Sequence, residues 1–185
     1  MKKSLEKGFI TPLPVFIIST YDENGVPNAM NAAWCGQVGP GMVSISLGEH
    51  KSTDNIRKNK ELTVSFATKE YVEACDYVGL VSQNKVPNKL EKCGFTVTKS
   101  EKVNAPIIDQ LPVAIECKVV DIQSEFGETR VVAEIVGVQA DESVLTDGVV
   151  DLGKLHPITY DTVAKCYREI GANVGGAWAA GKKFE

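Results

Sequence analysis

The dipeptide Asn24-Gly25 constrains the fold most, because it separates two stretches that have the composition of β-strands. Asn-Gly is typical of the tight turn that joins neighbouring antiparallel strands. The stretch before it, 15–21, follows Pro12 and Pro14 and begins with apolar and β-branched residues. The stretch after it covers 26–34. The turn therefore predicts an antiparallel hairpin early in the chain.

Further segments extend this pattern into a mainly β fold. Alternating or β-branched residues predict strands at 42–47, 62–67, 113–120 and 130–138. Apolar spacing and capping residues favour short helices at 55–60, 69–79 and 88–92. Because few helices separate the strands, we expect a β-barrel with added helices rather than a doubly wound sheet. Beyond residue 141 glycines punctuate the chain, and only short helices are expected there.

Length, charge and cysteine content narrow the class of protein. The 185 residues suit a single domain, 1–185, and apolar runs of four residues are far short of the roughly 20 that span a bilayer. A net charge of −4 without a basic stripe argues against a nucleic-acid partner. Five Cys without C-x-x-C spacing and two His predict no zinc site. The N-terminal residues do not resemble a signal peptide, so we expect a cytoplasmic protein with reduced thiols.

The segment from Ser46 to Asp54 passes from a strand through a polar loop into the start of a helix. Ser52, Thr53 and Asp54 are all favoured N-cap residues, and Lys51 stands beside them. Unpaired backbone N–H groups, two hydroxyls and a lysine at a helix N-terminus can hold a phosphate. The plainer alternative is that these residues only cap the helix while Lys51 is solvated. From residue types alone, capping is the commoner outcome.

The second hairpin strand contains two asparagines, Asn28 and Asn31, within a span of four residues. Asparagine is depleted in strands, so their presence needs a reason. One reason is that their amides meet a polar ligand, while the small side chains of Ala32 and Ala33 let a flat ring approach the backbone. The other is an edge strand at a bulge, with Trp34 in the core. The residues alone leave both interpretations open.

Familiar catalytic motifs are missing from the sequence. It contains no Walker motif, G-x-S-x-G or H-E-x-x-H. Segment 36–41 does not match G-x-G-x-x-G and is interpreted as a tight turn. His50 is a candidate proton donor, although a loop histidine is more often simply solvated. None of the cysteines has a nucleophile motif beside it.

Taken in order, these segments resemble the flavin reductase-like, FMN-binding split-barrel family, and within it the flavoredoxin-type members. The resemblance covers nearly the whole chain, and the order and spacing of its motifs make it diagnostic. Its main carriers are Asp22-Glu23-Asn24-Gly25, Pro27-Asn28-Ala29-Met30-Asn31-Ala32-Ala33-Trp34, 43–47, 50–56, Asp76-Tyr77-Val78-Gly79 and Asn88-Lys89-Leu90.

The resemblance implies a six-stranded Greek-key split barrel that forms a homodimer, with FMN near the subunit interface. In this reading Lys51 and a hydroxyl of Ser52 or Thr53 hold the phosphate, and Lys89 adds a distant cation. The segments 70–88 and beyond 141 exceed what six strands need, so we expect them to cover the flavin or to build the dimer. The implied cofactor-binding set is Asn28, Met30, Asn31, Ala32, Ala33, Trp34, Ser46, Leu47, His50, Lys51, Ser52, Thr53 and Lys89.

A flavin would carry the chemistry itself, which agrees with the missing catalytic motifs. Hydride transfer from NADH or NADPH to flavin N5 needs stacked rings and no side-chain acid or base. The leading hypothesis is therefore an NAD(P)H-dependent FMN oxidoreductase, a flavin reductase. The alternative is a flavoredoxin-like electron-transfer protein that holds FMN tightly, serves a redox partner protein and does not use NAD(P)H itself. The third hypothesis is a globular dimer with a vacant pocket.

Overall fold

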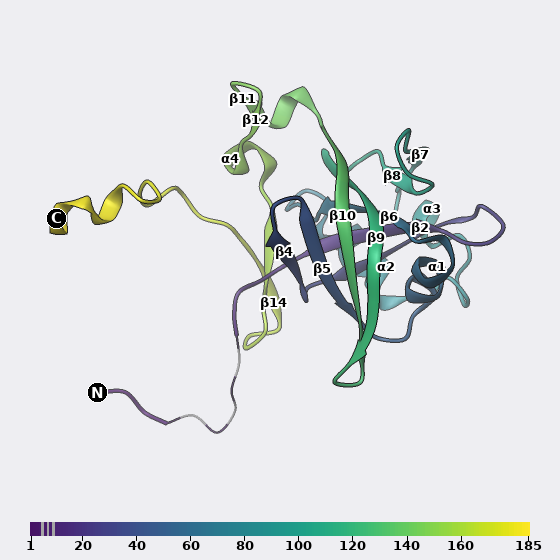
Figure 1. Ribbon diagram of the computed structural model, residues 1–185, viewed down its shortest axis with the longest axis horizontal. Helices are drawn as coiled ribbons and strands as arrows, with labels where there is room; N and C mark the ends of the chain where they lie inside the picture. The colour runs from purple at the N-terminus through teal and green to yellow at the C-terminus, as the bar shows by residue number, and fades with distance from the viewer. Residues whose placement is uncertain (5, 7, 9) are drawn as a thin grey trace.

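The computed structural model describes residues 1–185 except 5, 7 and 9. Its centre is a seven-stranded antiparallel sheet in the order β3-β2-β6-β9-β10-β5-β4, which curls around the core (Figure 1). These strands are β2 (Phe16–Tyr21), β3 (Pro27–Ala32), β4 (Cys35–Gly39), β5 (Met42–Leu47), β6 (Glu61–Phe66), β9 (Val113–Glu125) and β10 (Glu128–Ala140). The expected mainly β fold with added helices is confirmed.

Shorter elements surround the sheet. The helices are α1 (Lys51–Asn59), α2 (Val72–Leu80), α3 (Lys89–Lys92) and α4 (Leu152–Leu155), with 3-10 turns η1 (Glu142–Val144) and η2 (Ala180–Phe184). The small strands are β1 (Leu13–Pro14), β7 (Val97–Lys99), β8 (Pro106–Ile108), β11 (Leu145–Thr146), β12 (Val149–Val150), β13 (Ile158–Asp161) and β14 (Cys166–Glu169). No helix in the described part of the chain is long and apolar enough to cross a membrane.

The predicted hairpin forms between β2 and β3. Asp22 accepts hydrogen bonds from the backbone N–H groups of Asn24 and Val26, both at 2.9 Å, and so closes the turn. Gly25 has φ of 76°, a left-handed conformation that glycine adopts without steric cost. The hairpin leaves β3 at one edge of the main sheet, and β4 forms the other edge.

Strand β4 was not expected from the sequence. Segment 36–41 was expected to be a tight turn, but Cys35–Gly39 pairs with β5, and only Pro40 and Gly41 make the turn. Gly41 has φ of 68°, so the glycine serves the turn itself. The preceding glycines sit within an edge strand, where they are tolerated at a bulge. The main sheet thus has one strand more than the six expected.

The two faces of β2 bury different cores. Ile18 packs inside the curled sheet with Ile45, Leu62 and their neighbours. Ile17 points the other way, into a second cluster with Cys75 and Val78 of α2. Because successive strand residues alternate in direction, one strand joins both cores. Packing of α2 in the second cluster fixes the end of this helix beside β3.

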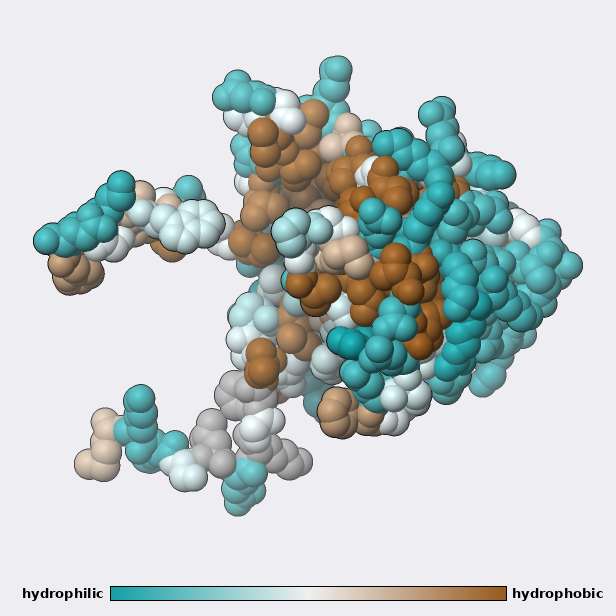
Figure 2. Space-filling view, viewed as in Figure 1, coloured by the Kyte–Doolittle hydropathy of each residue, from teal (hydrophilic) through white to brown (hydrophobic). Residues whose placement is uncertain are grey.

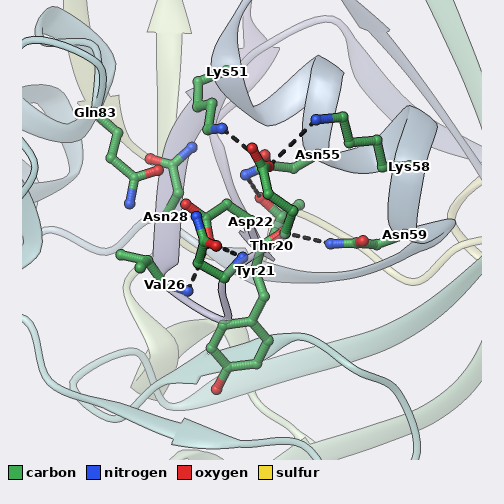
Figure 3. Close-up of polar contacts among 12 residues, drawn as sticks. Thr20, Tyr21, Asp22, Val26, Asn28, Lys51, Asn55, Lys58, Asn59 and Gln83 are labelled. Atoms are coloured by element: carbon green, nitrogen blue, oxygen red, sulfur yellow. Dashed lines mark hydrogen bonds and ion pairs between the residues drawn. The ribbon is translucent and has the colours of Figure 1, made fainter.

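Helix α1 begins earlier than predicted. Ser52 and Thr53 were expected to precede the helix, but it starts at Lys51, with His50 at the N-cap. Both residues lie in the first turn and are buried. Thr53 Oγ1 donates to the carbonyl of Gly48 at 2.7 Å, so it ties the helix to the preceding loop. Figure 3 shows that side chains of α1 also hydrogen bond to the end of β2.

The C-terminal part of the chain is more regular than predicted. β13 pairs with both β1 and β14, which makes a three-stranded sheet beside the body. Only short helices were expected beyond residue 141, because two four-residue strands give little periodicity. After β14 the chain extends away from the body (Figure 1), with Val174, Trp178 and Phe184 fully or largely exposed.

Candidate functional site

A pocket of about 1070 Å³ lies along the β3 edge of the sheet. One wall is formed by β3 and the residues that follow it, and the end of β5 with the start of α1 closes one end. The end of α2 and segment 81–89 form the facing wall, and β13 and β14 contribute at the other end. The pocket is therefore assembled from segments that lie far apart in the sequence.

One end of the pocket suits an anion; we call it the anion end and define it by Asn28, Lys51, Ser52 and Lys89. His50 caps α1 without a side-chain hydrogen bond, and the first N–H groups of a helix have no partner within it. The Ser52 hydroxyl lines the pocket and accepts from Asn28 Nδ2 at 2.8 Å. Lys51 Nζ lies 3.4 Å from Glu23 Oε2, so the cation is held at the helix start.

Lys89 brings a second cation to the anion end from across the pocket. Its side chain is buried, and Nζ donates to the carbonyls of Val78 at 2.9 Å and Val81 at 3.0 Å. Burial lowers the pKa of Lys89 to about 8. An ammonium carries three donors, so one N–H remains for a ligand. The helix carbonyls thus hold the lysine at the pocket wall.

Two amide oxygens mark where a ligand would complete the wall. Asn28 Oδ1 and Gln83 Oε1 are buried and have no hydrogen-bond partner among the described residues, although both side chains line the pocket. Gln83 Nε2 donates to the carbonyl of Pro27 at 2.9 Å, and Figure 3 shows the two amides next to each other. An unsatisfied buried acceptor costs about 1–3 kcal/mol. A ligand that offers hydroxyl donors here would remove that cost.

The other end of the pocket has aromatic side chains; we call it the ring end and define it by Asn31, Trp34, Asp76, Gly79 and Tyr167. Trp34 is 63% exposed beside the small residues of β3. Tyr167 donates from its hydroxyl to Asp76 Oδ1 at 2.6 Å, and Asn31 Nδ2 donates to the same hydroxyl at 3.4 Å. Burial raises the pKa of Tyr167, so the phenol stays protonated. This end therefore combines aromatic side chains with one hydrogen-bonded polar group.

Three of the cysteines are not activated nucleophiles. Burial raises the pKa of Cys35, Cys75 and Cys117 to about 12, and a thiol with so high a pKa carries almost no thiolate near neutrality. Within the described residues no group of three or more His, Cys, Asp or Glu side chains could hold a metal ion.

Comparison with known proteins agrees with this geometry. Residues 9–162 match the model of the flavin reductase like domain. The chain belongs to the flavin reductase-like family. Two solved flavoredoxins have TM-scores of 0.91 to this fold. The one from Desulfovibrio vulgaris (Miyazaki F) is 33% identical and covers 98% of this chain and 100% of its own. The one from Methanosarcina acetivorans is 28% identical and covers 100% and 99%.

A more distant structure supports the fold alone. An FMN-binding domain of a flavin reductases-like enzyme from Shewanella baltica has a TM-score of 0.79 at 21% identity, over 89% of each chain. The resemblance to the FMN-binding split-barrel family that the sequence motifs indicated is confirmed, and the chain has its split-barrel fold.

The structure brings together twelve of the thirteen residues that the family resemblance singled out. Thr53 is the exception: it does not line the pocket, and its hydroxyl donates to the carbonyl of Gly48. Of the two hydroxyls that the sequence could not separate, only that of Ser52 lines the pocket. The residues that line it are Asn28, Met30, Asn31, Ala32, Ala33, Trp34, Ser46, Leu47, His50, Lys51, Ser52 and Lys89.

Sequence reasoning missed several pocket residues, of which Asp76 alone stands in a motif that carried the family resemblance. Asp76, Gln83, Tyr160, Cys166 and Tyr167 all line the pocket. Cys166 and Tyr167 lie beyond the matched segment 9–162. The excess of chain in 70–88 and beyond 141 was the one signal that could have found them, since both segments supply pocket walls.

Proposed function

We propose that this chain is a single-domain FMN-binding oxidoreductase. The observation that carries the proposal is the combination of two unlike ends in one pocket. The anion end has a helix N-terminus with Lys51, and Lys89 lines the same pocket. The ring end has the aromatic side chains of Trp34 and Tyr167 beside small residues. A ligand with a phosphate at one end and a planar ring at the other fits both.

The residues present fit FMN along its whole length. In this proposal the phosphate meets the first N–H groups of α1, the Ser52 hydroxyl and Lys51, as expected for an anion at a helix N-terminus. The ribityl hydroxyls supply the donors that Asn28 Oδ1 and Gln83 Oε1 lack. Ala32, Ala33 and the backbone of β3 would line the ring, with Leu47 and Ser46 beside them.

When bound, FMN supplies the redox chemistry by accepting two electrons and a proton as hydride from NADH or NADPH. The chain's own residues bind and orient. Lys51, Ser52 and Lys89 fix the phosphate, and the facing wall from α2 to Lys89 limits the entry of water. Holding two rings in contact is a proximity effect, which can supply much of the rate enhancement without an acid or base.

The second candidate is a flavoredoxin-like electron-transfer protein that does not use NAD(P)H itself and serves a redox partner protein. The similarity to two flavoredoxins favours it specifically. The two candidates share the FMN site and differ only in the electron donor. An anaerobic spectrum of the FMN-loaded protein with NADH and with NADPH separates them.

Bleaching of the flavin absorbance by either nucleotide supports the reductase. Flavin that stays oxidised with both nucleotides but is reduced by dithionite contradicts the reductase and supports the electron-transfer protein. A chain that binds no FMN in a titration followed by flavin fluorescence contradicts both candidates.

We also propose a homodimer in the cytoplasm. Figure 2 shows apolar side chains gathered over β9 and β10, where Val120 and Val138 are more than half exposed. Exposed apolar patches on a sheet face commonly mark an interface. Light scattering should give twice the chain mass, and Val120→Glu with Val138→Glu should give the monomer. Five free cysteines suit a reducing compartment.

A further inference from the structure

Three side chains at the ring end form one hydrogen-bonded chain. Asp76 comes from α2, Tyr167 from β14 and Asn31 from β3. The Tyr167 hydroxyl lies 2.6 Å from Asp76 Oδ1 and 3.4 Å from Asn31 Nδ2. The Asn31 and Tyr167 positions are 136 residues apart in sequence. All three side chains line the pocket, so the chain is part of its wall.

The direction of each hydrogen bond follows from what each group can do. A carboxylate only accepts, so the Tyr167 hydroxyl must donate its single proton to Asp76. The Tyr167 oxygen can then only accept, and Asn31 must turn its NH₂ group toward it. The amide oxygen of Asn31 is left for the pocket, and it forms no hydrogen bond within the described part of the chain. Asp76 thus decides, through Tyr167, which atom Asn31 presents.

Gly79 leaves the space that this orientation needs. A Cβ at position 79 would lie 2.6 Å from Asn31 Cγ, closer than real Cβ atoms approach other heavy atoms. The helix α2 therefore supplies both the carboxylate that orients the amide and the gap in which the amide rests. These two contributions come from residues one helical turn apart, on the face that α2 turns to β3.

We propose that Asp76 and Tyr167 are positioning residues, which fix Asn31 as a hydrogen-bond acceptor for the ring of the bound flavin. The inference rests on the proposed FMN site. An oxidised isoalloxazine carries a single ring N–H, at N3, and its other polar ring atoms accept. A fixed acceptor at the ring end therefore selects N3–H, and it disfavours a ring that lacks this donor.

The test compares the affinities for FMN and for 3-methyl-FMN, in which a methyl group replaces the N3 hydrogen. The full chain should bind FMN roughly tenfold more tightly, because the methyl group would leave the Asn31 acceptor without a donor beneath the bound ring. Tyr167→Phe and Asp76→Leu, neither of which can take part in the hydrogen bond between these positions, should reduce this preference to threefold or less. A purely structural role would weaken both ligands equally and leave the ratio unchanged.

Tyr77→Phe is the matched control, since it deletes a hydroxyl on α2 outside the pocket lining and should keep the full preference. Tyr167→Phe removes only one oxygen, so it keeps the test valid if Asp76→Leu does not fold. A preference that survives in Tyr167→Phe overturns the inference, as does a wild-type chain that binds both ligands equally well. A wild-type chain that binds neither ligand instead contradicts the proposed FMN site.

Discussion

The anion end and the ring end of the pocket are built in different ways. Asn28, Lys51 and Ser52 lie within 25 residues of one another, on a hairpin and the first turn of a helix. The ring end joins α2, β3 and β14, and its key contact spans 136 residues. An anion can be held by a helix start, which is a local structure. A surface of defined shape and polarity requires distant segments to converge.

The largest effect is expected when the anion end is disabled. Lys51→Ala with Ser52→Ala should lower FMN affinity roughly 100-fold, because two hydrogen bonds to a charged group are lost at about 1.5 kcal/mol each. Riboflavin, which has the ring and no phosphate, should bind these variants as it binds the wild type. Fluorescence titrations with both ligands measure the difference.

Thr53→Ala is the matched control for this pair. It removes the buried bond to Gly48, so it should lower the free energy of unfolding by about 1 kcal/mol and leave FMN affinity nearly unchanged. If Thr53→Ala weakened FMN as strongly as the double variant does, the assignment of Ser52 to the pocket would be wrong.

The ring end should respond in the opposite way. Gly79→Ala forces the Asn31 amide away from Tyr167, because the new Cβ would overlap with it. We expect affinity for FMN and riboflavin to fall about tenfold together, as a small-to-large change in a packed site costs about 1–3 kcal/mol. Isothermal titration with both ligands tests this, and loss of FMN binding alone would contradict the division of the pocket.

For Lys89 we expect a smaller effect on FMN affinity, and one that depends on pH. Its pKa is lowered to about 8, so in the free protein the side chain loses its proton as the pH rises through 8. A bound phosphate favours the charged form, and FMN binding must then take up a proton. FMN affinity should fall as the pH rises above about 8, while riboflavin affinity stays flat.

In Lys89→Met this pH dependence of FMN affinity should vanish.

The lowered pKa of Lys89 also affects the free energy of unfolding. The folded chain carries the buried ammonium at a cost below pH 8, and this cost is relieved between about pH 8 and 10.5, where the unfolded lysine still holds its proton. Chemical denaturation at pH 7 and pH 10 should show the relief in the wild type and not in Lys89→Met.

The smallest change is a spectroscopic one. Trp34 lies in the pocket, whereas Trp178 lies in the extended C-terminal segment. FMN binding should quench tryptophan fluorescence, and Trp34→Phe should remove most of that quenching. Trp178→Phe is the control that should keep it. Equal quenching in the two variants would place the ring away from Trp34.

The contrast between the ends also explains what could be predicted from sequence. The turn at Asn24-Gly25 is set by neighbouring residues, so the hairpin was predictable. The residue types around Lys51 indicated a helix start there, although the helix begins earlier than they predicted. Thr53 and Ser52 could not be separated, because helix phase and not residue type decides which hydroxyl faces the pocket. Tyr167 gave no signal, since only the pairing of β13 with β14 carries it to Asn31.

The position of β3 at the sheet edge has a consequence for the protein without its ligand. An edge strand presents unpaired backbone groups, which can recruit a strand from another molecule. A planar ligand along β3 would cover these groups and act as a molecular cap against self-association. Cofactor supply during expression would then govern the yield of soluble protein as well as its redox chemistry.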